Sequence, residues 1–344
     1  MARVTVQGIA DQLGISKFAV SRALSGHAGV SPATRAAVVE LAARLGYVPR
    51  NRPASDINIE IIYHDVETMQ RELWVEVQAG AQLEGAKRGI GTAVRWTGDP
   101  QLVAGLASGA NGILLVGPHD DAIVAAIRQA EIPCVRIGGE LPPLEPMDKV
   151  DGVDGEGAAI VAQYLLELGH RRFVYVHGKL GYPGRMTRFE SFAETLAEAD
   201  GTALREMSFP ADNAPEDFRA ALTRMQDDGF QPTGFFCGND SVAVTVLTEL
   251  MRMGVNVPEQ ASVVGYADYA VASHTSPALT TVKVPYQKIG VAGVRLLLSR
   301  LGVGGPVNDL PAQRIGLVAE LIIRGSSGPA PKAHGADLKN RAAP

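Results

Sequence analysis

Ile9-Ala10-Asp11-Gln12-Leu13-Gly14-Ile15, followed directly by Ser16-Lys17-Phe18-Ala19-Val20-Ser21-Arg22-Ala23-Leu24-Ser25-Gly26, has the spacing of two short helices joined by a tight turn. Helices that cross steeply need a small residue where they approach most closely and a turn residue that tolerates a positive φ. Ala10 and Gly14 meet these two needs. Four apolar side chains fall where they would close a core between the helices: Ile9, Leu13, Ile15 and Val20.

The second of these helices has a polar start and a polar outer face. Ser16 is placed to accept a hydrogen bond from the first free amides of the helix, which makes it the expected N-cap. The outward residues are of the kinds that read base edges and phosphates in a major groove: Lys17, Phe18, Ser21 and Arg22. This face indicates a DNA-binding helix-turn-helix, and the spacing alone leaves an ordinary helical hairpin as the alternative.

A third helix is expected to complete a small head. Ser31 is its expected cap, Pro32 takes the first helical position, and the apolar stripe is Val38, Val39, Leu41, Ala42 and Leu45. Residues 1–52 carry seven basic and two acidic side chains, a net charge of +5, whereas the whole chain of 344 residues carries −5. The basic charge is therefore segregated to the head, which suits contact with phosphates.

Beyond the head, apolar strand-like runs alternate with helical segments, which predicts an α/β body of parallel sheets flanked by helices. In the first half, strands are expected at 59–63, 92–96, 112–116 and 133–137, with helices near 71–88, 99–108 and 120–130. In the second half, strands at 172–177, 204–209, 234–237 and 262–266 alternate with helices near 155–168, 185–199, 215–228 and 240–253. At about 150 residues per domain, the length fits a small head and two similar lobes.

Polar residues follow three of the expected strands. His64 and Asp65 follow the first strand, Asn239 and Asp240 follow the strand that ends at Cys237, and Asp268 follows the strand at 262–266. Ligands of open α/β folds bind beyond the carboxyl ends of the strands, so these side chains are candidates for binding a small polar ligand. For Asp240, capping of the following helix is the alternative role.

The sequence contains no Walker-type lysine loop, no His-Glu-x-x-His pair and no nucleophile elbow, so we expect no enzyme, catalytic residue, metal or cofactor. Cys134 and Cys237 are isolated within apolar strands, which favours buried free thiols over a disulfide or metal pair. His170 follows the helix-ending Gly169 and is expected to interact with terminal helix carbonyls. No run approaches the roughly 20 apolar residues that span a bilayer, so a cytoplasmic protein is expected.

Several segments resemble, in order and with the same spacing, those of the LacI family of bacterial transcription regulators. In the head they are Val4-Thr5-Val6-Gln7-Gly8-Ile9-Ala10, Val20-Ser21-Arg22-Ala23-Leu24-Ser25-Gly26, Val30-Ser31-Pro32-Ala33-Thr34-Arg35 and Leu45-Gly46-Tyr47-Val48-Pro49. In the body they are Leu168-Gly169-His170-Arg171-Arg172, Gly238-Asn239-Asp240, Ser262-Val263-Val264-Gly265-Tyr266 and Pro277-Ala278-Leu279-Thr280-Thr281-Val282. The resemblance runs from about residue 4 to about residue 324.

The resemblance implies the fold of periplasmic sugar-binding proteins, whose chain crosses between two lobes three times, here near 152, 283 and 312. The expected domains are a head at 1–48, a hinge at 49–57 and an effector-binding and dimerisation domain at 58–324. Its first lobe would take 58–151 and 284–311, including a helix at 287–301, and its second would take 152–283 and 312–324, including a last strand at 315–323. Small, polar and Pro-rich residues predict a disordered tail at 325–344.

The resemblance also implies a homodimeric, ligand-responsive repressor in which each head occupies half of a near-palindromic operator. Base contacts would come from Lys17, Phe18 and Arg22, and phosphate contacts from Thr5, Ser16, Ser21 and Thr34. Leu73-Trp74 resembles the place of an aromatic side chain over the effector, with a core position for Trp74 as the alternative, and Arg188 resembles the family's effector-binding arginine. An effector between the lobes would shift them and so change the spacing of the heads.

Two departures from the family pattern affect these expectations. Many sugar-responsive members have Gly-Tyr-Asp-Asp where this chain has Gly265-Tyr266-Ala267-Asp268, so a sugar effector is less secure than the fold suggests. The hinge Arg50-Asn51-Arg52-Pro53-Ala54-Ser55-Asp56 is about five residues shorter than the usual pattern and lacks the leucine that wedges into the minor groove. We therefore expect weak or absent kinking of the DNA, with Arg50 and Arg52 entering the minor groove from an extended arm.

Two other functions compete with this interpretation. A solute-binding protein of the periplasmic type shares the lobes, although the basic head and the absence of a signal peptide count against it. Alternatively, the head binds DNA while the lobes dock a protein partner through a degenerate cleft, an arrangement that Ala267 keeps open.

Overall fold

The computed structural model describes residues 5–24, 30–45, 47, 56–305 and 307–332. The chain forms two compact units, Met1–Asp151 with Tyr286–Ile315, and Gly152–Pro285 with Gly316–Pro344. We call them unit 1 and unit 2. The chain therefore passes between the units three times, and the third passage lies after residue 315 instead of near 312. The expected hinge contacts Arg50 and Arg52 lie outside the described residues.

The head is a cluster of three helices: α1 (Val6–Leu13), α2 (Lys17–Leu24) and α3 (Pro32–Arg44). Gly14 ends α1 with a φ of 64°, the left-handed conformation that the turn between α1 and α2 needs. The core includes Ile9, Val20 and Leu41, with Leu13 and Ile15 packed against it. The prediction that Val39 belongs to the core stripe is wrong, because its side chain is exposed on α3.

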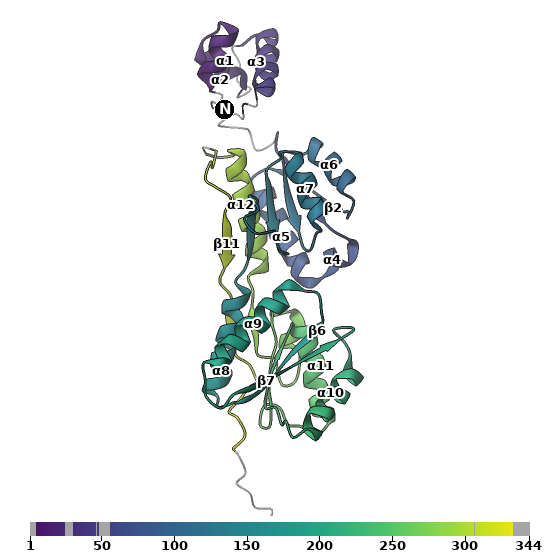
Figure 1. The fold of residues 1–344 in the computed structure, drawn as a ribbon. Coiled ribbons are helices and arrows are strands. Elements are labelled where there is room, and N and C mark those ends of the chain that lie inside the picture. Colours follow the sequence, from purple (N-terminus) through teal and green to yellow (C-terminus); the bar gives the residue numbers. More distant parts are fainter. Residues whose placement is uncertain (1–4, 25–29, 46, 48–55, 306, 333–344) are drawn as a thin grey trace, which may run out of the picture. The chain divides into compact units, whose positions relative to one another are not determined.

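Unit 1 contains a six-stranded sheet in the order β11-β5-β4-β3-β1-β2, and the β1–β2, β1–β3, β3–β4 and β4–β5 pairs are parallel. Helices cover both faces of the sheet (Figure 1). Its strands are β1 (Asn58–Tyr63), β2 (Gly91–Trp96), β3 (Gly112–Val116), β4 (Cys134–Ile137), β5 (Asp148–Gly152) and β11 (Arg314–Leu317). Its helices are α4 (Val66–Gln70), α5 (Glu72–Lys87), α6 (Pro100–Gly109), α7 (Asp121–Gln129) and α12 (Tyr286–Leu301).

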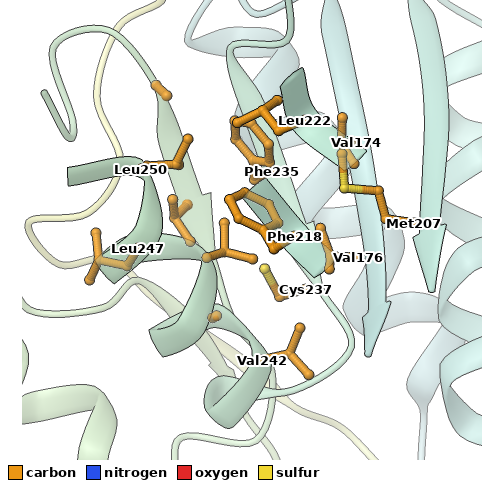
Figure 2. Packing of buried hydrophobic residues seen from close by; sticks show 14 of the residues in the cluster. Val174, Val176, Met207, Phe218, Leu222, Phe235, Cys237, Val242, Leu247 and Leu250 are labelled. Carbon is orange, nitrogen blue, oxygen red and sulfur yellow. The ribbon is translucent and has the colours of Figure 1, made fainter. Parts of the chain in front are cut away.

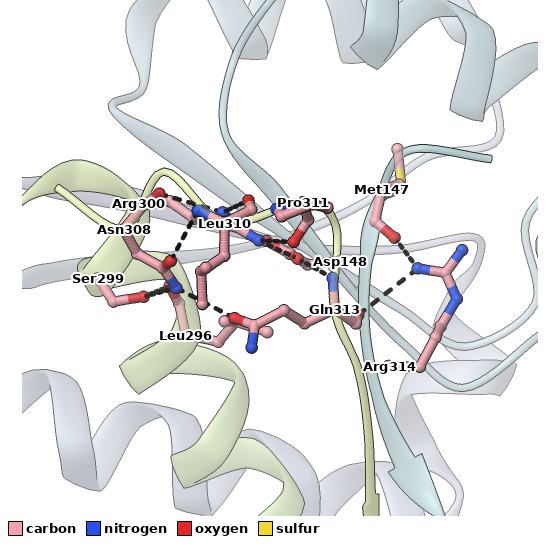
Figure 3. A network of polar contacts seen from close by, with 10 residues as sticks. All are labelled: Met147, Asp148, Leu296, Ser299, Arg300, Asn308, Leu310, Pro311, Gln313 and Arg314. Atoms are coloured by element: carbon pink, nitrogen blue, oxygen red, sulfur yellow. Dashed lines mark hydrogen bonds and ion pairs between the residues drawn. The ribbon is translucent and has the colours of Figure 1, made fainter. Parts of the chain in front are cut away.

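The expected strand at 315–323 is corrected in two respects. It is divided into β11, which joins the sheet of unit 1 beside β5, and β12 (Glu320–Ile322), which pairs with β10 (Thr281–Lys283) in unit 2. A buried ion pair explains the first part: Arg300 Nε and Nη2 each lie 2.7 Å from a carboxylate oxygen of Asp148 on β5. The amide of Gln313 donates to the same carboxylate, which fixes the chain entering β11 against β5 (Figure 3).

Unit 2 contains a parallel four-stranded sheet in the order β7-β6-β8-β9 and the two-stranded β10-β12 sheet. The remaining strands are β6 (Arg172–Lys179), β7 (Ala203–Phe209), β8 (Gly234–Cys237) and β9 (Ser262–Val264). The helices are α8 (Asp154–Glu167), α9 (Pro183–Ala197), α10 (Pro215–Asp227), α11 (Asp240–Arg252) and the 3-10 turn η2 (Ala270–Ser273). An apolar core that includes Phe218, Phe235 and Leu250 packs α10 and α11 onto the sheet (Figure 2).

The tail predicted to be disordered is packed against unit 2 as far as the structure describes it, to residue 332. Ser326 is fully buried; its hydroxyl donates to the carbonyl of Val263 and accepts from the amide of Thr280. His170 is also fully buried, and its Nε2 lies 3.1 Å from the carbonyl oxygen of Gly328. Hydrogen bonds within unit 2 therefore fix residues 325–332, a segment whose composition predicted disorder.

Both cysteines are free, but only Cys237 is buried. Cys134 is partly exposed and lines a pocket of about 430 Å³ at the amino end of β4. Within the described ranges, no helix has the length and apolar character needed to cross a membrane.

Candidate DNA interface and ligand-binding edges

The outer surface of α2 is the candidate DNA interface. Ser16 Oγ accepts a hydrogen bond of 3.1 Å from the amide of Ala19, so Ser16 caps α2. Lys17 and Phe18 are exposed in the first turn, and 68% of the Phe18 surface is accessible, which is unusual for a large apolar side chain. Ser21 and Arg22 belong to α2, but their side chains lie outside what the structure describes.

Three of the four predicted phosphate contacts, Thr5, Ser16 and Thr34, lie at helix N-termini, whereas Ser21 lies in the middle of α2. Thr5 Oγ1 accepts 3.0 Å from the amide of Gly8 at the start of α1, and the Thr34 hydroxyl lies 2.8 Å from Ser31 Oγ at the start of α3. A hydroxyl that accepts a hydrogen bond as a cap keeps its own proton to donate. Thr5 and Ser16 therefore remain able to donate to a phosphate beside the positive ends of α1 and α2.

In unit 1, the residues expected to bind an effector gather at the carboxyl edge of the sheet. Trp74 on α5 packs its indole against Gly117 and Gly138, which follow β3 and β4. A Cβ at Gly138 would lie only 2.2 Å from Trp74 Cη2, so this glycine is required by the close approach of the ring. Leu73 precedes Trp74 on α5 and is partly exposed.

His64 and Asp65 follow β1 at the same edge. The Asp65 carboxylate accepts 2.5 Å from the amide of Thr68 and caps α4, and this hydrogen bond lowers the pKa of Asp65. Asp65 is thus an exposed, ionised cap. The ring of His64 lies edge-on to that of His119, with their centroids 5.9 Å apart.

In unit 2, Arg188 on α9 connects three elements at the carboxyl edge of the sheet. Its Nη1 donates 2.7 Å to the carboxylate of Asp154 at the start of α8, and its Nη2 donates 2.8 Å to the carbonyl oxygen of Gly238 after β8. The guanidinium lies 4.1 Å from the centroid of the Tyr266 ring, a cation–π contact after β9. These contacts hold the group in a fixed orientation.

A second arginine on α9 forms a tighter pair next to it. Arg185 donates 2.7 Å from each of Nη1 and Nη2 to the two carboxylate oxygens of Asp212, a bidentate pair. Asn239 caps α11 by accepting 2.9 Å from the amide of Val242, and its side-chain amide lies 3.3 Å from Asp212. Asn239 therefore lies at the edge as predicted from sequence and is also a cap.

The placement of Asp240 argues against its predicted role in effector binding. Its side chain has 0% exposure, its Oδ1 accepts from the Thr281 hydroxyl and its Oδ2 accepts from the amide of Tyr269. Burial raises the pKa of Asp240 to about 6. Asp240 therefore joins α11 to β10 and to the loop of Asp268, where the Asp268 carboxylate accepts 2.7 Å from Arg324.

The sequence prediction missed several residues of these two edges: His119, Arg136, Asp154, Arg185, Asp212 and Tyr266. Asp212 follows β7 and obeys the rule that singled out Asn239, so position alone would have identified it. Arg136 is a charged residue inside the apolar run of β4, and a charge in a buried strand is a signal that could have identified it. In the part of the chain that the structure describes, no group of three or more His, Cys, Asp or Glu residues is placed to hold a metal ion.

Two family models match the chain. Residues 5–50 match the bacterial regulatory proteins of the lacI family, and residues 162–327 match a periplasmic binding protein-like domain. The HTH-type transcriptional regulator CelR of Thermobifida fusca is 30% identical over 318 residues, 87% of this chain and 92% of CelR. The probable HTH-type transcriptional repressor ExuR of Bacillus subtilis (strain 168) is 25% identical over 312 residues, 86% of this chain and 91% of ExuR.

Solved structures agree with these matches. A complex of the regulator CelR with cellobiose is 27% identical, with a TM-score of 0.65 over 94% of this chain and 100% of that one. The lac repressor dimer bound to operator and the anti-inducer ONPF is 23% identical, with a TM-score of 0.66 over 95% of this chain and 100% of that one, and supports the fold.

Proposed function

The chain belongs to the LacI family of bacterial regulatory proteins, and from this premise we propose that it is a repressor that binds a near-palindromic operator as a homodimer and responds to a small polar effector. The observation that carries the proposal is the outer surface of α2, where a capped helix start presents Lys17 and the exposed Phe18. A basic, apolar-tipped helix face is suited to a major groove, where cations meet phosphates and apolar side chains meet thymine methyl groups.

We assign the DNA contacts by the chemistry of each side chain. Lys17, Phe18 and Arg22 contact bases, and Thr5, Ser16, Ser21 and Thr34 position phosphates. Arg50 and Arg52 of the hinge at 49–57, which lie outside the described residues, are assigned to the minor groove. The head at 1–48 and the hinge at 49–57 thus supply the DNA contacts, and the domain at 58–324 supplies the effector response and the dimer contacts.

The residues that we assign to effector binding lie, within each unit, at the carboxyl edge of that unit's own sheet. Trp74 supplies a flat apolar surface in unit 1, and Arg188 and Asn239 supply charged and amide groups in unit 2. An aromatic face combined with polar groups suits a sugar-like molecule. The solved CelR complex contains cellobiose, which supports a saccharide as the starting class of compound to test.

The effector acts by changing the balance between conformations that hold the operator well and poorly. The size of the response is set by the difference in its affinity for those conformations. We assign no catalytic step to any residue. A repressor of this kind acts on chromosomal DNA, and we place it in the cytoplasm.

The test measures binding of the purified full chain to DNA that flanks its own gene. Fluorescence anisotropy gives the affinity at several salt concentrations. Lys17→Ala and Phe18→Ala are compared with Lys87→Ala, an exposed lysine on α5 outside the head. If Lys17 contacts a base, its loss weakens specific binding by about 1–3 kcal/mol. If it contacts a phosphate, its loss lowers the slope of the logarithm of the binding constant against the logarithm of the salt concentration by about 1. Phe18→Ala is expected to reduce sequence discrimination and leave the salt slope unchanged.

Lys87→Ala should bind as the unaltered chain does. The proposal is wrong if no flanking sequence is bound more tightly than unrelated DNA, or if the Lys87 control weakens binding as much as the two α2 variants.

A further inference from the structure

Among the described residues beyond the head, three arginine side chains are buried, and they differ in their partners. Arg185 and Arg188 in unit 2 each donate to a carboxylate, of Asp212 and Asp154 respectively. Arg136 in unit 1 is the most deeply buried, with 1% exposure, yet no carboxylate of the described residues forms an ion pair with it. A buried charge without a counter-ion is costly, so its retention in an apolar strand calls for an explanation.

The Arg136 guanidinium lies under the turns that follow β3 and β4. Its Nε donates 3.1 Å to the carbonyl oxygen of Gly138, and its Nη2 lies 3.3 Å from the carbonyl oxygen of His119. The third nitrogen, Nη1, is buried and has no hydrogen-bond partner among the described residues. Gly139 has a φ of 68°, a conformation that favours glycine, and a Cβ there would lie 2.4 Å from Nη2, so a side chain at this position would displace the guanidinium.

Two histidines at the same edge also carry unpaired nitrogens. His119 Nε2 lies 3.2 Å from the carbonyl oxygens of both Ile62 and Val116, so Nε2 carries the proton. Burial, aided by Arg136, lowers the pKa of His119 to about 4, and the ring is therefore neutral near pH 7. Its Nδ1 is then an acceptor, and within the described ranges both this atom and Nδ1 of His64 are buried without a partner.

The Arg136 cluster is the name we give to Arg136, His119 and His64. It combines a permanent cation with a neutral acceptor at the edge where ligands of α/β sheets bind, and the neighbouring Asp65 carboxylate is already engaged as the cap of α4. Asp121 and Asp151 act on Arg136 only at longer range. An anion that also carries hydroxyl groups matches this set, because its charge satisfies Arg136 and a hydroxyl donates to a histidine nitrogen.

We propose that the Arg136 cluster binds the carboxylate or phosphate group of an anionic effector, so that the compound recognised is a sugar acid or sugar phosphate and not a neutral sugar. This inference rests on the proposed function, because it adds a charged group to the effector assigned to the same edge of unit 1. The shared chemistry is an oxyanion, and a free inorganic anion is the other source to be distinguished.

The test compares the unaltered full chain with Arg136→Met and with Arg128→Met. Arg128 lies on α7 of the same unit, is largely exposed and pairs with Glu145 at 3.0 Å, so its loss makes the same change in net charge elsewhere. The probes are D-glucose, sodium D-glucuronate, D-glucose 6-phosphate and inorganic phosphate at equal ionic strength. Binding is measured by isothermal titration calorimetry and by the shift in Tm.

We expect one or both anionic sugars to bind the unaltered chain and the Arg128 variant equally, and glucose to bind at least about tenfold more weakly. Arg136→Met should abolish this preference for the anion. Without any ligand, Arg136→Met should raise Tm, because an apolar side chain replaces an unpaired buried charge. Arg136→Lys keeps the positive charge but loses the planar guanidinium, so it should bind the anions with intermediate affinity. This variant is the control in case Arg136→Met does not fold.

The proposal is overturned if glucose binds as tightly as its anionic counterparts, if Arg136→Met and Arg136→Lys bind the anions normally, or if neither anionic sugar binds. Inorganic phosphate as effective as the sugar anions would overturn the assignment to the effector and leave a free-anion site. Operator binding is measured on the same samples. If the unaltered chain binds its operator specifically but binds neither anionic sugar, this inference alone is refuted. If the unaltered chain binds no operator specifically, the proposed function is refuted.

Discussion

Gly138 adopts a φ of 71° beneath the indole of Trp74, and both properties make an alanine there unfavourable. The left-handed conformation costs an alanine about 1–2 kcal/mol. The added Cβ would also lie 2.2 Å from Trp74 Cη2 and 3.0 Å from Cζ3, and overpacking of this kind costs about 1–3 kcal/mol. We therefore expect Gly138→Ala to lower the free energy of unfolding by about 2–5 kcal/mol.

Gly89→Ala is the matched control for backbone strain. Gly89 has a similar φ of 68°, and a Cβ there meets nothing within 4 Å, so its substitution should cost only the conformational part, about 1–2 kcal/mol. The difference between the two variants isolates the contact with Trp74. In a Trp74→Ala background that difference should vanish, because the ring that causes the clash is gone.

The assay is urea unfolding, monitored by far-UV circular dichroism and by the fluorescence emission of Trp74. The chain has two tryptophans, so a Trp96→Phe background makes Trp74 the single reporter. Gly138→Ala should shift the Trp74 emission to longer wavelength and abolish any effector response while operator binding persists. Equal destabilisation by the two glycine variants, or an unchanged Trp74 emission, would refute the placement of the indole at the carboxyl edge of unit 1.

Three further predictions concern the ion pairs and the tail. Asp148→Ala should lower the free energy of unfolding by about 3–5 kcal/mol, because it leaves the Arg300 guanidinium without its carboxylate partner. Asp228→Ala, which removes an exposed partner of Arg205, should lower it by less than about 1 kcal/mol. Both values are measured from urea unfolding curves. Burial raises the pKa of Asp240 to about 6, so its contribution to stability is complete well below pH 3.8 and is lost as the pH rises through 6. Relative to Asp240→Asn, the free energy of unfolding should fall by about 2 kcal/mol between pH 4 and 7.5. Ending the chain after residue 324 removes the buried Ser326 and should lower the Tm of unit 2, measured by calorimetry.

The elements that could be predicted from sequence are those whose causes are local. Ser16 caps α2 because a serine before a helical run accepts from a nearby amide, and Gly14 takes a positive φ because the turn demands it. The strands β3 and β8 are continuous apolar runs, as buried parallel strands usually are, and β1 is apolar except for Asn58 and Glu60. In each case the neighbouring residues contain the whole reason for the structure.

The elements that were missed depend on residues far away in sequence. β5 reads Asp-Lys-Val-Asp-Gly and has little strand character of its own, but Asp148 is bound by Arg300 and by the chain entering β11. Ser326 is polar and follows a loop-like sequence, yet its partners on β9 and beside β10 bury it. Asp240 follows a strand as a ligand residue would, and only Thr281 and Tyr269 show that its oxygens are already used.

The most direct test of the central claim is thermodynamic linkage between operator and effector. Operator affinity is measured at fixed salt with and without each of a panel of sugars, sugar acids and sugar phosphates, and the affinity for any active compound is then measured with and without operator. A ligand-responsive repressor requires one compound to change operator affinity by some factor and the operator to change that compound's affinity by the same factor. Specific operator binding that no compound alters would contradict the account.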